Sequence, residues 1–201
     1  MKKFELTADT KMFLGRKLFR IKALISFGNV KVGDMGGYIE KEENLSQSGN
    51  AWVYGDARVY GNARVSGNAR VYGDAWVYGN AWVYGDAWVY GNAWVSGNAR
   101  VYGNARVYGD AWVYGNARVY GDAWVYGDAD YATASGFGSE YRTTTFFKLK
   151  NSDEIGVRCG CFYGTLKEFK EKVKETHGET KKAKEYLMLA DLMEYRFSEE
   201  K

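Results

Sequence analysis

The sequence contains no proline, and only two cysteines and one histidine stand among its 201 residues. Although glycine is abundant, the absence of proline excludes collagen and proline-rich linkers. Two cysteines cannot form a disulfide framework, so a reducing interior or indifference to redox state fits best. No apolar run approaches the ~18 residues of a membrane span, and no signal-peptide core follows Met1-Lys2-Lys3. We therefore expect a cytoplasmic protein without a membrane segment.

Aromatic residues are plentiful, with 17 tyrosines and 7 tryptophans. This aromatic content argues against a disordered chain. The formal net charge of +3 is too small for a strongly basic nucleic-acid binder. The composition therefore predicts an ordered protein whose partners are not selected by bulk charge.

A six-residue repeat runs without a break from Ala51 to Asp128, which makes thirteen hexads. Positions one, three and five are always Ala, Val and Gly; position two is Trp or Arg, and position six is Asn or Asp. Position four is Tyr except at Ser66 and Ser96. A period of six does not fit an α-helix but suits a short strand and a corner. Because one unit recurs unchanged, we predict successive coils of a parallel solenoid rather than antiparallel hairpins.

The two sides of each strand differ in size. Ala and Val never vary and are slim enough to fill a narrow tube, so we predict that they form the interior. Trp, Arg and Tyr alternate with them and must then point outward. Gly followed by Asn or Asp supplies the bend at each corner.

The segment Val53-Tyr54-Gly55-Asp56-Ala57-Arg58 resembles the hexapeptide repeat of left-handed parallel β-helices. The resemblance implies three strands per coil, 18 residues per turn and a left-handed crossover; without it, a right-handed connection would be the default. The corner residues support a three-sided solenoid. When every third corner is placed in one column, one of the columns contains only Asn: Asn62, Asn80, Asn98 and Asn116. A two-sided solenoid would align every second corner instead, and both of its columns would then contain Asn and Asp.

We predict a mainly β protein with a three-sided parallel solenoid over residues 51–128. Residues 1–50 are expected to form an N-terminal β cap with a first irregular coil. Short strands are expected at 18–24 and 30–32, and degraded hexads at residues 36–39 and 45–50.

Residues 129–201 are expected to form a small α+β unit. Residues 130–138 lose the repeat and read as a loop, and two strands, at 142–150 and 155–162, are expected to form a hairpin across residues 151–154.

Two helices are expected after the hairpin. Thr165 and Glu168 form a capping box, which opens a helix that ends near Gly178. A second helix is expected at about 181–196, with these candidate buried positions: Tyr186, Leu187, Ala190, Leu192 and Met193. The unit is thus predicted to have a ββαα order.

The chain also resembles uncharacterised accessory proteins of bacteriophages and prophages. Besides the hexads, the likeness lies in Gly33-Asp34-Met35-Gly36-Gly37, Thr143-Thr144-Thr145-Phe146-Phe147, Cys159-Gly160-Cys161-Phe162 and Glu175-Thr176-His177-Gly178. The resemblance implies a phage origin and a solenoid, and it carries no established activity.

Catalytic residues are scarce. Hexapeptide acyltransferases use a His as base and hexapeptide carbonic anhydrases hold zinc with three, whereas the only His here is His177, outside the repeat. Cys159, Cys161 and His177 could supply three zinc ligands, but no fourth is visible, so we predict that the cysteines are small buried core residues. A cation between Asp56 and Asp74, or between Asp110 and Asp128, is the alternative metal site. We expect no enzymatic activity, no cofactor and no metal.

At an 18-residue spacing the outward side chains form three ladders. The first is Trp52, Arg70, Trp88, Arg106 and Trp124; the second is Arg58, Trp76, Trp94 and Trp112; the third is Arg64, Trp82, Arg100 and Arg118. Alternating Trp and Arg suits cation–π stacking. One interpretation is that the ladders stabilise neighbouring coils, and another is that they form a binding surface; the two are compatible. We assign partner binding to the first two ladders.

These observations predict a non-enzymatic, rigid solenoid that binds a macromolecule. Through the phage resemblance, the hypothesis is that the partner is a host protein of an antiviral defence, blocked stoichiometrically. Alternatives are a self-assembling scaffold, for which a homo-oligomer is expected, and a binder of glycans or single-stranded nucleic acid. Nucleic acid is disfavoured because the repeat balances six Arg against six Asp.

Overall fold

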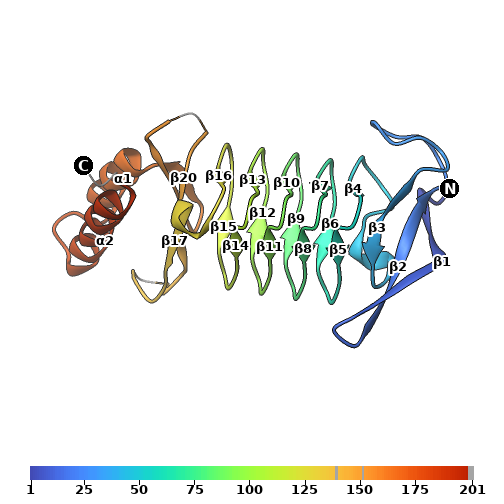
Figure 1. Ribbon diagram of the computed structural model, residues 1–201. Coiled ribbons are helices and arrows are strands. Elements are labelled where there is room, and N and C mark those ends of the chain that lie inside the picture. Colours follow the sequence, from blue (N-terminus) through green and yellow to red (C-terminus); the bar gives the residue numbers. More distant parts are fainter. Residues whose placement is uncertain (139, 151, 199–201) are drawn as a thin grey trace.

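The computed structural model describes residues 1–138, 140–150 and 152–198. A parallel β-solenoid lies between an N-terminal β unit and a C-terminal unit of one antiparallel sheet and two helices (Figure 1). The predicted mainly β fold class is confirmed, while the left hand of the coil stays a prediction. None of the described helices is both long and apolar enough to cross a membrane.

Each hexad contributes one two-residue strand at its second and third positions. In chain order these are β4 (Trp52–Val53), β5 (Arg58–Val59), β6 (Arg64–Val65), β7 (Arg70–Val71), β8 (Trp76–Val77), β9 (Trp82–Val83), β10 (Trp88–Val89), β11 (Trp94–Val95), β12 (Arg100–Val101), β13 (Arg106–Val107), β14 (Trp112–Val113), β15 (Arg118–Val119) and β16 (Trp124–Val125). Every third strand pairs in parallel, which gives the orders β4-β7-β10-β13-β16, β5-β8-β11-β14 and β6-β9-β12-β15. The solenoid therefore has three sides and a register of 18 residues, as predicted.

The interior consists of the invariant small residues. Every Ala and Val of the thirteen hexads is at most 1% exposed. Twelve of the hexad glycines have φ between +59° and +73°, a region that side chains with a Cβ rarely adopt. At Gly67 a Cβ would also lie 3.0 Å from the backbone nitrogen of Gly85 in the next coil. Corner glycine is therefore required both by backbone angle and by close stacking.

The hydrogen bonds between coils that flank the paired strand residues run in one direction. The N–H of one coil donates to a carbonyl of the following coil, as from Tyr54 to Val71 at 2.8 Å and from Trp76 to Ala93 at 2.9 Å. Carbonyls of the first coil and N–H groups of the last coil consequently lack repeat partners. A buried backbone group without a partner is costly, so each end needs its own cap.

The N-terminal unit extends the β5-β8-β11-β14 sheet. It comprises β1 (Phe4–Phe13), β2 (Arg16–Ala23) and β3 (Met35–Ile39), and β3 runs parallel to β5. Strand β1 was not predicted from the sequence, because its two-residue turn is Leu14-Gly15, with φ of +48° and +75°, and Leu at such an angle is not a turn signal. The strand expected at 30–32 is wrong; only an isolated bridge joins Phe27 and Val30.

The first coil is irregular, as expected, and longer than the rest. Leu45 pairs with Val65, 20 residues later, whereas Asn50 contacts Asn68 at the regular spacing of 18. The two extra residues lie in the corner around Gln47, whose side-chain oxygen accepts a hydrogen bond from the Lys3 N–H at 2.8 Å. A short 3-10 helix (Glu42–Asn44) precedes this corner.

Two buried side chains supply donors to the free carbonyls of the first coil. The Lys3 ammonium donates to the Ala51 carbonyl at 2.9 Å. The Asn44 amide donates to the carbonyls of Ala63 at 2.8 Å and Gly61 at 3.1 Å. Burial lowers the pKa of Lys3 to about 8.

The C-terminal unit has more strands than predicted. After a 3-10 turn (Asp128–Asp130) come β17 (Tyr131–Ala134), β18 (Thr144–Lys148), β19 (Ile155–Cys159) and β20 (Phe162–Thr165), which form one antiparallel sheet in that order. The β18–β19 hairpin is confirmed, and residue 151 of its expected turn lies outside the described residues. The prediction of a loop at 130–138 is wrong for residues 131–134, because these residues form β17 and pair antiparallel with β18. The observed order is ββββαα.

Both predicted helices are present, as α1 (Leu166–His177) and α2 (Lys181–Phe197). The capping box is confirmed, since the Thr165 hydroxyl accepts from the Glu168 N–H at 3.3 Å and the Glu168 carboxylate from the Thr165 N–H at 2.7 Å. Of the five candidate buried positions in α2, Tyr186, Ala190 and Met193 are buried and Leu187 is half-buried. The expectation for Leu192 is wrong, because the buried face follows a spacing of three or four and selects Leu189 instead.

Acceptors cap the free N–H groups of the last coil. The Asp128 carboxylate accepts from the Trp112 N–H, and the Thr145 hydroxyl accepts from the Arg118 N–H, both at 2.9 Å. The third side is continued by an antiparallel bridge between Ala123 and Leu149. Most side-chain caps are thus donors at the first coil and acceptors at the last, although the Tyr131 hydroxyl also donates to the Trp112 carbonyl.

Replacing Thr145 by Val should lower the free energy of unfolding by about 1–2 kcal/mol, because the Arg118 N–H loses its acceptor while side-chain volume is kept. Urea unfolding followed by tryptophan fluorescence measures the change. Thr133→Val, on an exposed position of β17, is the matched control and should change the free energy by less than about 0.5 kcal/mol. Equal losses in the two variants would contradict the capping role.

The depressed pKa of Lys3 makes stability depend on pH. The unfolded chain holds the Lys3 proton up to its ordinary pKa of 10.5, while the folded chain releases it near 8, so the unfolded state binds more protons between these values. The free energy of unfolding should therefore rise between about pH 8 and 9.5, by roughly 1.5 kcal/mol. Urea unfolding across this range tests it: Lys3→Met should lose the rise and Lys2→Met should keep it. The same rise in Lys3→Met would refute the assignment.

Candidate functional site

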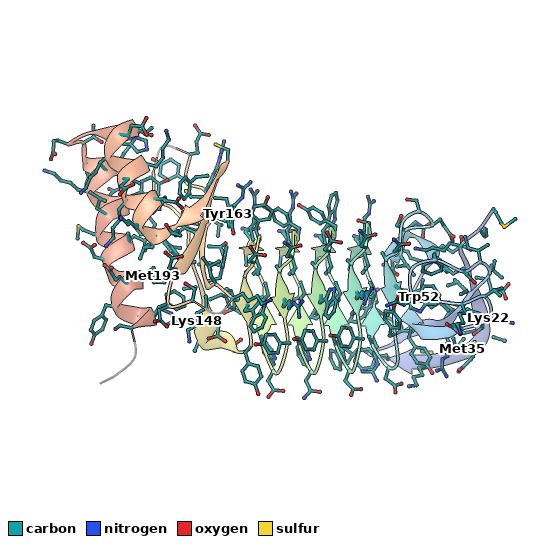
Figure 2. The ribbon with its side chains drawn as sticks, turned by 90° about the horizontal axis from the view of Figure 1, so that it is seen from above. Lys22, Met35, Trp52, Lys148, Tyr163 and Met193 are labelled. Carbon is teal, nitrogen blue, oxygen red and sulfur yellow. The ribbon has the colours of Figure 1, made fainter. Side chains whose placement is uncertain are left out.

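The outer surface of the solenoid carries the predicted site residues. We call the outer side of β5, β8, β11 and β14 the Trp face, that of β4, β7, β10, β13 and β16 the alternating face, and that of β6, β9, β12 and β15 the Arg face. The strand pairing places the three predicted ladders in one column each. Seen from above, the rings and guanidinium groups project from the solenoid along its length (Figure 2).

The Trp face is a continuous stack of indole rings. Trp76 and Trp94 stack in parallel with centroids 4.4 Å apart, and Trp94 and Trp112 at 4.5 Å. The guanidinium of Arg58 precedes the stack, lying 5.5 Å from the Trp76 ring and 4.9 Å from Phe13 of the β1–β2 hairpin. Trp112 ends the stack and is 47% exposed. The result is a pre-ordered aromatic strip with one open end.

A tyrosine column runs beside the Trp stack and is interrupted once. Tyr60 and Tyr78 stack with centroids 5.1 Å apart, Ser96 occupies the next position, and Tyr114 follows with 61% exposure. Burial raises the pKa of Tyr60 to about 12. The small Ser96 side chain leaves Trp94 without a neighbouring phenol on its own strand.

The alternating face shows the predicted cation–π order. The Arg70 guanidinium lies 5.2 Å from the Trp88 ring, and Arg106 lies 4.4 Å from Trp88 and 5.7 Å from Trp124. Lys150, from outside the repeat, continues the ladder at 5.3 Å from Trp124. Sequence reasoning missed Lys150, because only the folding of the hairpin back onto the last coil brings it there.

Trp52, at the start of the alternating face, is not available to a partner. Its ring points outward from the tube but is covered by the rings of Phe4 and Phe27, whose centroids lie 6.2 Å and 5.4 Å from that of Trp52. Only 1% of the residue is therefore exposed (Figure 2). Its assignment to the binding surface is therefore corrected. The N-terminal unit uses Trp52 as part of its own core, a contact that the hexads alone could not indicate.

The guanidinium groups of the hexads have no ionic partners within the described part of the chain. Neither a salt bridge nor a side-chain hydrogen bond involves Arg58, Arg64, Arg70, Arg100, Arg106 or Arg118 among the contacts of the described residues. The hexad aspartates sit at the corners, where three of them accept hydrogen bonds from Asn of the preceding coil. All of these arginines except Arg118 lie against aromatic rings, and they keep their hydrogen-bond donors for other groups.

The candidate zinc ligands do not assemble. Cys159 ends β19, with its sulfur 3.2 Å from the Thr144 hydroxyl, while Cys161 lies in the following turn and is exposed. His177 lies against the Tyr186 ring, with centroids 6.0 Å apart. Among the described residues no three His, Cys, Asp or Glu side chains converge as metal ligands. The prediction of two buried core cysteines is wrong for Cys161, because the tight turn at Gly160 ends the strand before it.

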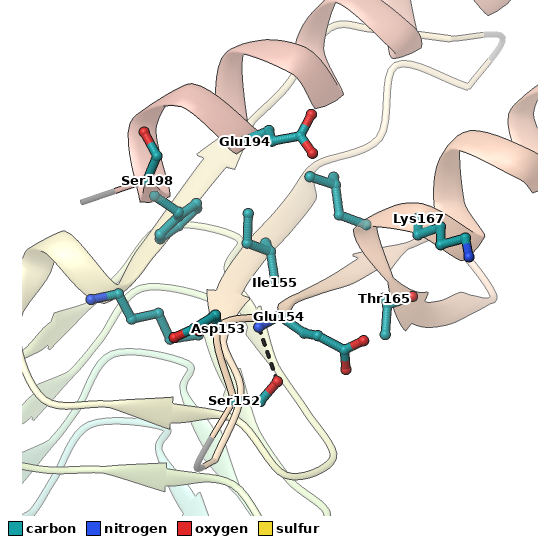
Figure 3. A pocket seen from close by; sticks show the side chains of 11 residues that line it. Ser152, Asp153, Glu154, Ile155, Thr165, Lys167, Glu194 and Ser198 are labelled. Carbon is teal, nitrogen blue, oxygen red and sulfur yellow. Dashed lines mark hydrogen bonds between the residues drawn. The ribbon is translucent and has the colours of Figure 1, made fainter. Parts of the chain in front are cut away.

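A cavity of about 540 Å³ lies in the C-terminal unit between the β18–β19 turn and the ends of both helices (Figure 3). Its lining mixes carboxylates with lysines, and within it the Glu154 N–H donates to the Ser152 hydroxyl at 3.0 Å. Glu194 of α2 pairs with Lys170 at 2.6 Å, and no salt bridge joins it to Lys167 of α1 among the described residues (Figure 3). This arrangement offers no matched acid and base within the described lining.

Comparison with protein families gives one match. Segments of the repeat match the model described as the YdcK Beta solenoid repeat, at residues 51–65, 57–73, 63–79, 77–91, 99–115 and 111–127. A search of curated proteins found no match. The matched segments lie wholly within the hexads, so the comparison agrees with the coils and is silent on both flanking units. The chain is a β-solenoid repeat protein whose hexads are similar to the YdcK repeat.

Proposed function

We propose that this chain is a non-catalytic binding protein that holds a macromolecular partner on its Trp face. The observation that carries the proposal is the parallel stack of Trp76, Trp94 and Trp112, open to solvent at Trp112. Trp, Tyr and Arg are the residues that dominate binding energy at protein interfaces. All three types lie side by side on this face.

Rigidity favours binding over a purely structural role. Each indole is already fixed by its neighbours, so a partner loses little side-chain entropy when it packs against the stack. Cross-strand aromatic pairs stabilise a sheet by only about 0.2–1 kcal/mol each, and slim aliphatic residues already fill the tube. A ladder of large exposed rings exceeds what the coils need for stacking.

The partner is proposed to be a protein. The hexads balance six Arg against six Asp, which gives little driving force for phosphate neutralisation along a nucleic acid. The resemblance to phage accessory proteins supports a bacterial host protein as the target, blocked stoichiometrically as part of an antiviral defence. A homo-oligomer that buries two Trp faces against each other is the competing proposal, because a flat repetitive face is self-complementary.

Replacing Trp76, Trp94 and Trp112 together by Ser should abolish partner capture while the fold is retained, since the Ala and Val interior is untouched. Affinity capture from a bacterial host lysate with quantitative mass spectrometry measures the loss. The matched control replaces three exposed apolar residues of α2, Met188, Leu192 and Tyr195, by Ser and should capture the partner as the wild type does.

Light scattering of the purified chain and of the captured complex separates the two proposals. A one-to-one complex of a monomeric chain supports partner binding. A dimer that the triple Trp variant converts to a monomer supports self-assembly instead. Capture of the same protein by the triple variant at the wild-type level would contradict the Trp-face proposal.

A further inference from the structure

One pair of arginines in the hexads breaks the pattern of the other ladders. Arg100 and Arg118 lie directly opposite each other on β12 and β15, whereas the other four hexad arginines face Trp on at least one neighbouring coil and never another Arg. Like charges opposite each other destabilise a sheet. The Arg100 guanidinium lies 5.3 Å from the Trp82 ring on one neighbouring coil, whereas the residue opposite it on the other neighbouring coil is Arg118.

The Arg pair lies beside the corner without a carboxylate. Every other corner column of the repeat contains Asp, while this one is Asn62, Asn80, Asn98 and Asn116. The amides of this column bond in one direction, each donating to the oxygen of the next coil at 3.2 Å. The last amide, that of Asn116, has no acceptor among the described residues. The column therefore ends in a free N–H₂ group next to Arg118.

A cavity of about 340 Å³ opens at this place, between the last coils and the loop that precedes β18. Asn98, Arg100, Asn116 and Arg118 line it from the solenoid, and Arg142 from the loop. Gly160 adjoins Arg142, and a Cβ there would lie 3.1 Å from the guanidinium, so glycine keeps room for it. Three guanidinium groups thus meet around one cavity.

The charges around the cavity do not balance. Its only lining carboxylate is Glu140, which pairs with Arg142 at 3.5 Å. Arg100 and Arg118 have no carboxylate partner in the part of the chain that the structure describes. Three positive charges against one negative charge leave an excess of about two. A phosphate monoester carries about −1.5 to −2 charges at pH 7, whereas a carboxylate or a phosphodiester carries only one.

We propose that this cavity binds the dianionic phosphate of a small phosphate monoester. Planar guanidinium forks bind phosphate oxygens in pairs, and the Asn116 amide adds a neutral donor. The volume is at the lower end of the range for small-molecule sites, which fits a compact ligand. The site does not rest on the proposed partner binding, because it lies on the Arg face across the Asn corner from the Trp stack.

Isothermal titration of the full chain at pH 7.5 tests the proposal. Inorganic phosphate and phenyl phosphate should each bind once and saturably, and dimethyl phosphate and acetate at least about tenfold more weakly. Arg118→Gln should weaken phosphate binding about tenfold or more, the loss expected for one charge-assisted hydrogen bond. Arg64 lies on the same face and, like Arg100, stacks on Trp82, but it lies outside the cavity; Arg64→Gln should therefore bind phosphate as the wild type does.

Thermal unfolding provides a second measurement. Phosphate should raise the melting temperature of the wild type and of Arg64→Gln but not of Arg118→Gln, whose own melting temperature without phosphate should not fall, since a repulsion is removed. Tighter binding of phenyl phosphate than of inorganic phosphate would identify an organic monoester as the ligand. The proposal is overturned if phosphate does not saturate by 10 mM, if dimethyl phosphate binds equally well, or if Arg64→Gln weakens binding as much as Arg118→Gln.

Discussion

The hydrogen bond between successive coils is the interaction on which the molecule depends. The N–H groups at positions two, four and six of the hexads donate to carbonyls 17 residues later, at about 2.8–3.1 Å over most of the repeat. This register brings residues 18 apart into contact, so any regularity of the sequence becomes a column in space. The slim interior, the glycine corners and the aromatic faces are consequences of that one spacing. Because the bonds that flank the strands point the same way, the first coil leaves mainly carbonyls and the last coil mainly N–H groups for the flanking units to pair.

The sequence predicts the columns well and the ends poorly, for a physical reason. A repeat with period six leaves few alternatives for its register, and the all-Asn corner already separates three sides from two. Covering Trp52 by Phe4 and Phe27, or extending the alternating face by Lys150, depends on how non-repeating segments fold back onto the coils. Such long-range contacts have no local signal. The turn at Leu14-Gly15 likewise has no typical turn composition, and the strand before it was missed for that reason.

The surface ladders show how a balanced composition can still produce local charge. The hexads have no net charge, yet the corner columns and the faces distribute it unevenly. On the alternating face, aspartates and arginines share the Asn68–Asp86–Asn104–Asp122 edge of the solenoid. On the Arg face beyond the Asn corner, three arginines gather with Glu140 as the one lining carboxylate among the described residues. Net charge therefore excludes a general polyanion binder without excluding a site for one small anion.

Departures from the repeat are where specific chemistry arises. In a uniform ladder, every coil offers the same surface, so no point along the rod is preferred. Ser96 opens the tyrosine column beside Trp94, two extra residues near Gln47 reach the N-terminal unit, and Arg118 stands where Trp would relieve the charge of Arg100. Each departure reduces the regularity that stabilises stacking, and each creates a position that can be distinguished from its neighbours. A solenoid built from nearly identical coils can recognise a defined ligand only at such positions.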